Sequence, residues 1–222
     1  MVWSARTRKL TIAGSVAGGL TGFAVFMGAG FTGLLMMTVF FLMGTVATSW
    51  KRPAKEKAGL AESRQGRTAG QVLANAGMGG LLGIAAMVWR HHAGLFVVMM
   101  AAAFASAAAD TVSSELGNVY GSRYYNIITF KKDHRGLNGV VSLEGTLLGM
   151  AASICIAGAY AVGFVWNWSF LFIVAAGTLG NLADSVLGAT LERRQQLNND
   201  AVNFCNTLLA ALAAGGLYQL IG

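Results

Sequence analysis

The chain has 222 residues, of which 55% are hydrophobic and only 11% are charged. Soluble domains usually carry about 25% charged residues, so this composition excludes an ordinary soluble domain and indicates an integral membrane protein. The net charge of +7 does not call for a nucleic-acid partner, because cationic loops of membrane proteins contact anionic lipids. Cys155 and Cys205 lie inside apolar runs, which indicates packing residues and neither a disulfide framework nor a metal site.

Apolar stretches of about 20 residues, enough for a helix to cross about 30 Å of hydrocarbon, follow one another along the chain. Strand alternation is absent, so a barrel is excluded. We therefore expect an all-α, polytopic transmembrane helical bundle that forms a single integral membrane domain over residues 1–222. The seven expected spans are Leu10–Met27, Phe31–Trp50, Gln71–Trp89, Gly94–Ala109, Gly139–Phe164, Ser169–Ala189 and Ala201–Leu220.

The positive charges predict the orientation of these spans. All of the 16 lysines and arginines except Arg90 lie in the N-terminal tail or in the polar loops 51–70, 111–137 and 191–200. Because cytoplasmic loops carry the excess of Lys and Arg, we expect the N-terminus inside and the C-terminus outside, in the cell (inner) membrane. Glycines repeat every four residues at Gly14, Gly18 and Gly22, at Gly79 and Gly83, and at Gly145 and Gly149; they predict close helix contacts.

The acidic residues gather at the predicted cytoplasmic ends of the spans. Asp110 closes the fourth span and Glu115 follows it, Glu144 lies early in the fifth, Asp184 late in the sixth, and Asp200 opens the seventh. Inserting a carboxylate into a transmembrane helix costs about 2.5–3.5 kcal/mol of free energy. An acid at such a position therefore predicts a functional site. The structural alternative is an acid that pairs with an arginine to hold helices together. Packing alone does not require all of these acids at one depth.

Helical spacing places polar side chains on shared faces. Asp200, Asn203 and Thr207 form one stripe, and Asn181, Asp184 and Ser185 form another. Asn138 and Ser142 share a face, but Glu144 points about 120° away from it. Either that helix is central, or its glycine-rich start is unwound, as at many ligand sites. A weak parallel repeat, approximately residues 71–117 and 134–192, begins with an asparagine and ends with an aspartate each time.

Carboxylate and amide oxygens at one depth, surrounded by arginines and lysines, suit Mg²⁺ and polyphosphate. Phosphoryl transfer depends mainly on positioning and charge neutralisation. We therefore expect Mg²⁺ to be held by Asp110, Glu144, Asp184 and Asp200, with Glu115 as a fifth catalytic acid. Lys55 lies on the same side but outside these motifs, and we expect Lys55→Gln to keep near-normal activity.

The same residues carry a resemblance to a known family. Five blocks begin at Gly66-Arg67, Ala109-Asp110, Asn138-Gly139, Asp184-Ser185 and Asn198-Asn199-Asp200. In these blocks the chain resembles the phytyl-phosphate kinase family, the integral membrane proteins grouped as domain of unknown function ninety-two. Val112 and Val140 stand where tryptophan and glycine are expected, and Ala76 interrupts an expected Asn-Gly-Gly run. The carboxylates are intact.

The resemblance implies transfer of a terminal phosphate, from CTP or another nucleoside triphosphate, to an isoprenoid monophosphate such as phytyl or geranylgeranyl phosphate. The active site would face the cytoplasm, and the lipid tail would lie between helices. The side chains expected to bind substrate and nucleotide phosphates are Arg67, Gln71, Asn75, Lys132, Arg135, Asn138, Ser142, Asn199 and Asn203.

Two other functions remain open from the sequence. A lipid or small-molecule transporter or flippase would suit the repeat and the intramembrane acids, although the acids lie at one face only. An intramembrane prenyltransferase would suit Asn199-Asp200-Ala201-Val202-Asn203, although its further aspartates are missing. Membrane lipids are expected partners, and the sequence does not choose between a monomer and a homo-oligomer.

Overall fold

The fold is a bundle of helices, seen in a computed structural model that describes residues 9–60, 66–164 and 166–221. The predicted cations Arg6, Arg8 and Arg64 lie outside these residues. The α-helices of the described chain are α2 (Ile12–Ser49), α3 (Arg52–Lys57), α4 (Ala69–Val88), α5 (Ala93–Tyr120), α6 (Leu143–Gly163), α7 (Trp168–Leu187) and α8 (Asn199–Ile221). Six of them are long and apolar enough to cross a membrane. The expectation of an all-α polytopic bundle is confirmed.

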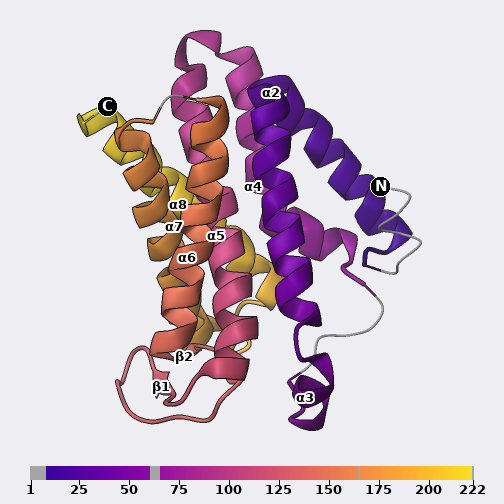
Figure 1. The fold of residues 1–222 in the computed structure, drawn as a ribbon, viewed down its shortest axis with the longest axis vertical. Helices are drawn as coiled ribbons and strands as arrows, with labels where there is room; N and C mark the ends of the chain where they lie inside the picture. The colour runs from indigo at the N-terminus through magenta and orange to yellow at the C-terminus, as the bar shows by residue number, and fades with distance from the viewer. Residues whose placement is uncertain (1–8, 61–65, 165, 222) are drawn as a thin grey trace.

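Helix α2 contains both of the first two predicted spans. It folds back on itself at Gly30, whose φ of 58° and ψ of −147° lie outside the helical region. Glycine adopts a positive φ without the clash that a Cβ would cause. A Cβ on Gly22 would lie 3.6 Å from the sulfur of Met37, a contact that a straight helix could not make. The two arms, residues 12–29 and 31–49, therefore form a hairpin (Figure 1).

Helix α4 runs parallel to the first arm of α2. At their starts, the Thr11 amide donates to the Arg67 carbonyl (3.1 Å) and the Arg67 amide donates to the Lys9 carbonyl (3.0 Å). Further along, a Cβ on Gly80 would lie 3.2 Å from the Thr21 side chain, and one on Gly83 would meet the backbone of Ala24. The predicted packing role of the glycine repeat is confirmed here, because only small residues allow such close approach.

Helix α5 occupies the centre of the bundle and contacts α2, α4, α6, α7 and α8. Residues 100–109 of this helix are all buried, and most of them are alanine. Phe104 and Met100 are the large side chains in this stretch, and they pack with Ile156 and Ile173 of the neighbouring helices. The small alanine side chains let five helices approach α5 closely, so α5 packs against each of them.

Two boundaries and one short helix differ from the prediction. Helix α5 continues beyond Ala109 to Tyr120, because the polar residues that suggested a loop lie on a helical face above the site. Helix α6 begins at Leu143, since Gly139 has a φ of 71° and residues 140–141 (β2) pair with residues 125–126 (β1). The unwound start is therefore the correct alternative of the two. The short helix α3 was not predicted.

The polar connections all lie at one end of the bundle. The loops that carry the described lysines and arginines join the ends of α2, α5 and α7 to the starts of α4, α6 and α8. Arg90, in the 3-10 turn η1 (Arg90–His92), lies between α4 and α5 at the other end (Figure 1). The segregation of charge expected from the sequence is present, and its orientation toward the cytoplasm stays a prediction.

That orientation can be tested with single cysteines in a chain whose Cys155 and Cys205 are replaced by alanine. His91 and Lys132 are both exposed, at opposite ends of the bundle. We expect a membrane-impermeant maleimide to label His91→Cys in intact cells and to label Lys132→Cys only after permeabilisation, because the cationic end is inside. Labelling of Lys132→Cys alone in intact cells would contradict the predicted orientation.

Candidate functional site

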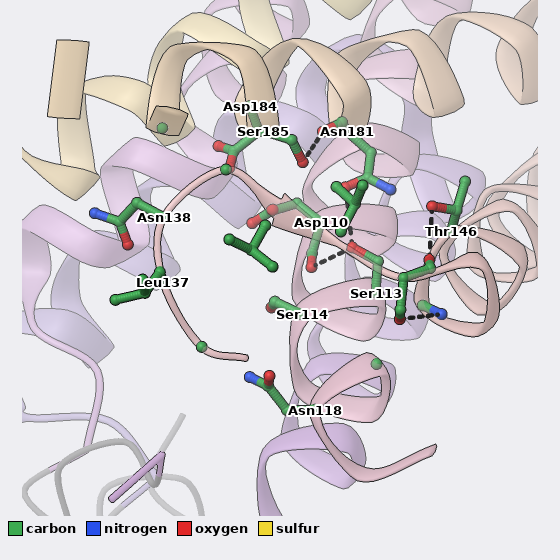
Figure 2. A pocket seen from close by; sticks show the side chains of 18 of the residues that line it. Asp110, Ser113, Ser114, Asn118, Leu137, Asn138, Thr146, Asn181, Asp184 and Ser185 are labelled. Atoms are coloured by element: carbon green, nitrogen blue, oxygen red, sulfur yellow. Dashed lines mark hydrogen bonds between the residues drawn. The ribbon is translucent and has the colours of Figure 1, made fainter. Parts of the chain in front are cut away.

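A polar cavity, called here the acidic cavity, lies between α5, α6, α7 and the loop before α6. Its wall includes Asp110, Ser113, Ser114, Asn118, Asn138, Ser142, Thr146, Asn181, Asp184, Ser185, Glu192 and Asn199. Figure 2 shows Asp110 of α5 and Asp184 of α7 turned toward the same space, with Asn138 on the loop across from them. Two aspartates from distant parts of the sequence thus share one cavity, at the end of the bundle where the acids were expected to gather.

The two aspartates are held close together. The side chains of Asp110 and Asp184 line the same cavity and are close enough to interact with each other. Ser113 Oγ lies 3.0 Å from Asn181 Oδ1 and 3.0 Å from the Asp110 carbonyl oxygen, so these two acceptors share its single proton. The contact with Asn181 joins α5 to α7 beside the pair. Two adjacent carboxylates repel one another when both are ionised, so this position favours a cation between them.

A chain of hydrogen bonds supports Asp184 from inside the bundle. Ser106 Oγ donates to Asn206 Oδ1 (3.0 Å), and Asn206 Nδ2 donates to Asp184 Oδ1 (2.7 Å). Ser106 and Asn206 are both fully buried. A buried amide whose oxygen is already occupied can only present its N–H₂ to Asp184, so the carboxylate keeps a fixed orientation.

A second polar cavity, called here the arginine cavity, lies on the other side of Asp110. It is lined by Arg67, Gln71 and Asn75 of the α4 region, by Asp110, Thr111, Ser114 and Glu115 of α5, and by Asn199 and Asn203 of α8. Asp110, Ser114 and Asn199 line both cavities. Asp110 and Ser114 are four residues apart and therefore share the ridge of α5 that separates the two spaces.

Arg67 is positioned by backbone pairing and by a glycine. Its amide and carbonyl both bond to the chain that leads into α2. Its guanidinium packs against the second arm of α2, where a Cβ on Gly44 would lie 3.0 Å from Nη2. Among the described residues no ion pair joins Arg67 to a carboxylate. A fixed cation in a polar cavity is suited to binding phosphate oxygens.

The loop between α5 and α6 is clamped to the end of α7. Arg193 Nε donates to the Asn138 carbonyl (2.6 Å) and Arg193 Nη2 to Asp133 Oδ2 (2.8 Å). The Arg193 hydrogen bond holds the pKa of the Asp133 carboxyl below its usual value. The chain also packs Gly139 against Ala189 of the π-helical turn η2 (Gly188–Glu192), leaving no room for a side chain. These contacts place Asn138 at the rim of the acidic cavity.

Glu115 is engaged by Lys55, a contact that the sequence did not predict, and the near-normal activity expected of Lys55→Gln stays a prediction. Lys55 is only 2% exposed, and its ammonium donates to Glu115 Oε2 and to the carbonyls of Ala47 and Thr48 (both 2.9 Å). The ammonium therefore anchors the short helix α3 to the ends of α2 and α5. Lys55 was placed outside the motifs because the sequence showed only another loop lysine.

Several predicted site residues lie apart from the two cavities. Glu144 Oε1 accepts hydrogen bonds from the Ser122 amide (3.1 Å) and hydroxyl at the outer side of α6. Asp200 lines an apolar cleft with Gly70 and Phe204. Lys132 is exposed on the β1–β2 loop, while Arg135 Nη1 reaches the carbonyl of Asn118 at the rim (3.4 Å). The remaining predicted residues, Gln71, Asn75, Asn138, Ser142, Asn199 and Asn203, line one or both cavities.

The four predicted metal ligands do not meet at one point. Within the described ranges no group of three His, Cys, Asp or Glu side chains is arranged to hold a metal ion. Asp110 and Asp184 are adjacent, whereas Glu144 and Asp200 face other surroundings. Mg²⁺ in phosphate-binding sites commonly uses one or two carboxylates and completes its coordination with phosphate oxygens and water. The Asp110–Asp184 pair fits this donor set.

Several residues of the site were not among the predicted ones. Asn206, Ser106, Ser113 and Glu192 support or line the acidic cavity. Asn206 had a signal in the sequence, because Asn199, Asn203 and Asn206 follow an i, i+4, i+7 pattern. The predicted stripe started one residue later, at Asp200, and so missed this face of α8.

Comparisons with known proteins identify the family of the chain. Residues 1–211 match the model of the family described as integral membrane protein DUF92. The chain is 33% identical over 220 residues to Protein VTE6, chloroplastic, of Arabidopsis thaliana, covering 96% of this chain and 66% of that protein. It thus spans less than two thirds of that relative's length.

Two uncharacterized membrane proteins are also similar. One, from Synechocystis, is 32% identical over 88% of this chain and 78% of its own length. The other, from Methanocaldococcus jannaschii, is 29% identical over 96% of this chain and 87% of its own length. No solved structure matches the chain.

The buried Lys55–Glu115 pair generates a prediction about stability. Lys55→Gln leaves Glu115 without its ammonium, and losing one partner of a buried pair costs about 3–5 kcal/mol. We expect a correspondingly lower free energy of unfolding for the purified protein in detergent, measured by denaturant titration. The matched control is Lys57→Gln, because Lys57 is exposed on the same helix. Equal stability of the two variants would show that the pair does not anchor α3.

Proposed function

Because the chain belongs to the DUF92 family of integral membrane proteins, we propose that it is an isoprenoid-phosphate kinase. It transfers the terminal phosphate of a nucleoside triphosphate, with CTP as the first candidate, to phytyl or geranylgeranyl monophosphate. The observation that carries this proposal is the position of Asp110 between two polar cavities, one acidic and one lined by Arg67. Two phosphate-bearing substrates can approach the same carboxylate from opposite sides.

The reaction requires little covalent chemistry from the protein. An oxygen of the acceptor monophosphate bonds to the terminal phosphorus of the nucleotide, while the bond to the bridging oxygen breaks and the nucleoside diphosphate leaves. A phosphate monoester has a second pKa near 6, so the acceptor is largely a dianion at neutral pH and needs no general base. The barrier lies in bringing two polyanions together, which cationic groups lower.

The side chains of the acidic cavity would hold Mg²⁺ and the nucleotide phosphates, and those of the arginine cavity would bind the acceptor phosphate. Asp110 and Asp184 would hold Mg²⁺, which neutralises charge on the nucleotide phosphates when bound. Asn206 and Ser106 keep Asp184 oriented. On the other side, Arg67 binds the acceptor phosphate, and Asn75, Asn199 and Asn203 supply amide donors. Fixed groups of this kind stabilise the transition state because they need no rearrangement during the reaction.

The distribution of polar groups favours the kinase over the transporter. Beyond Ser106, the described part of α5 toward its N-terminal end is lined by buried apolar residues, among them Val97, Val98 and Phe104. Among the described residues, the two buried charged side chains, Lys55 and Glu115, both lie at the cationic end. A transporter needs a polar path through the bundle for its substrate, and an enzyme needs a site at one face only.

The activity itself is tested with purified protein in detergent. We expect geranylgeranyl monophosphate, Mg²⁺ and CTP to give the diphosphate and CDP, without any membrane gradient, and we expect excess EDTA to abolish turnover. A panel of ATP, GTP and UTP identifies the donor. The kinase proposal would be wrong, and the transporter alternative favoured, if folded protein formed no diphosphate with any donor but moved lipid across the membrane of liposomes.

The roles of the paired aspartates generate a second prediction. Asp110→Asn and Asp184→Asn should fold normally but lose about 10²–10³-fold or more in kcat, as expected when one electrostatic contact to the transition state is removed. Their unfolding midpoints should stay equal to or above the unsubstituted value, because the change relieves repulsion between carboxylates. Glu56→Gln, on exposed α3, serves as the matched control with unchanged kcat. Full activity of both aspartate variants would make the pair a packing feature.

A further inference from the structure

An apolar groove opens between the two arms of α2 and the start of α4. Gly18 and Gly22 of the first arm form one wall, and Leu34, Met37 and Phe41 of the second arm form the other. The positive φ of Gly30 creates this groove, since it turns the chain back and leaves the arms to diverge away from the turn (Figure 1). Leu42, which is 49% exposed, lies at the open side of the groove.

The groove ends at the arginine cavity. Arg67 and Asn75 line both spaces, so a molecule in the groove would end against a guanidinium and an amide. The groove and the acidic cavity share no lining residue. In space, the apolar groove therefore leads to Arg67, then to Asp110, and then to the acidic cavity. This order matches a ligand with an apolar tail and an anionic head.

We infer that the apolar groove holds the isoprenoid tail of the acceptor, with its phosphate on Arg67, and that the nucleotide enters the acidic cavity. This assignment rests on the proposed kinase function and adds to it a binding subsite and a determinant of chain length. Charge complementarity selects the occupant, because a neutral lipid would leave Arg67 without an anion and a nucleotide would place polar groups against leucine, methionine and phenylalanine.

The small residues of the first arm explain how a branched chain fits. Gly22 lies on the groove wall, and a Cβ there would be 3.6 Å from Met37 Sδ and 3.9 Å from Leu34 Cδ2, both ordinary contacts. A leucine at this position could therefore be accommodated by the backbone, with its remaining carbons inside the groove. The room taken by those carbons is lost to the tail of the substrate.

The test compares long and short acceptors. For Gly22→Leu we expect kcat/KM for geranylgeranyl monophosphate to fall about tenfold or more, with a much smaller change for geranyl monophosphate, because a filled pocket rejects the longer chain. Gly216→Leu is the matched control, since Gly216 is exposed on α8 with nothing within 4 Å of a Cβ. It should keep the chain-length preference of the unsubstituted protein.

A second measurement uses the unsubstituted chain, so it does not depend on how a variant folds. A geranylgeranyl monophosphate analogue with a diazirine near the tail end should cross-link within residues 34–42, and unlabelled geranylgeranyl monophosphate should compete. Cross-linking at another site, or an active Gly22→Leu protein with unchanged preference, would overturn the groove assignment. Unsubstituted protein that cross-links in the groove but forms no diphosphate would overturn the kinase and leave the lipid subsite in place.

Discussion

The cost of placing charge in hydrocarbon is the constraint on which the rest of this structure depends. Ionisable side chains are stable only near water or against a partner, so the described acids and nearly all described cations lie at one end of the bundle. The other end can then be built from small apolar residues. The alanine-rich centre of α5 lets five helices meet around it, and this close packing brings distant polar segments to the same depth.

Within the polar end, the structure separates acids that are bonded to neighbouring segments from the two aspartates that meet in the acidic cavity. Glu115 is bonded to buried Lys55, and Glu144 is bonded to Ser122 at the start of α6. Asp110 and Asp184 instead both line the acidic cavity, and the side-chain amide of Asn206 orients the Asp184 carboxylate. Adjacent carboxylates repel one another when both are ionised, and close pairs of acids of this kind are typical of functional sites.

The hairpin in α2 links the membrane to this site. Gly30, which has a positive φ, turns the apolar helix α2 back on itself. The two arms of α2 then flank the start of α4. Backbone pairing between residues 9–11 and Arg67 closes the same end and sets the guanidinium between the apolar groove and the arginine cavity. Under the proposed function, the lipid phosphate approaches Asp110 from the side of the apolar groove, and the nucleotide approaches it from the acidic cavity.

By itself the sequence determined the class of protein, the approximate spans and the end at which charge gathers, because hydropathy and the positive charges act through local composition. It also singled out Asp110, Asp184, Arg67 and most of the asparagines. Only the tertiary structure decided which acids meet. Glu144 and Asp200 lie at the same end of the bundle as the pair but contact other neighbours, and Lys55 is buried although the sequence shows it only as a loop lysine. Depth follows from position along a helix, whereas the direction of a side chain depends on how that helix rotates against its neighbours.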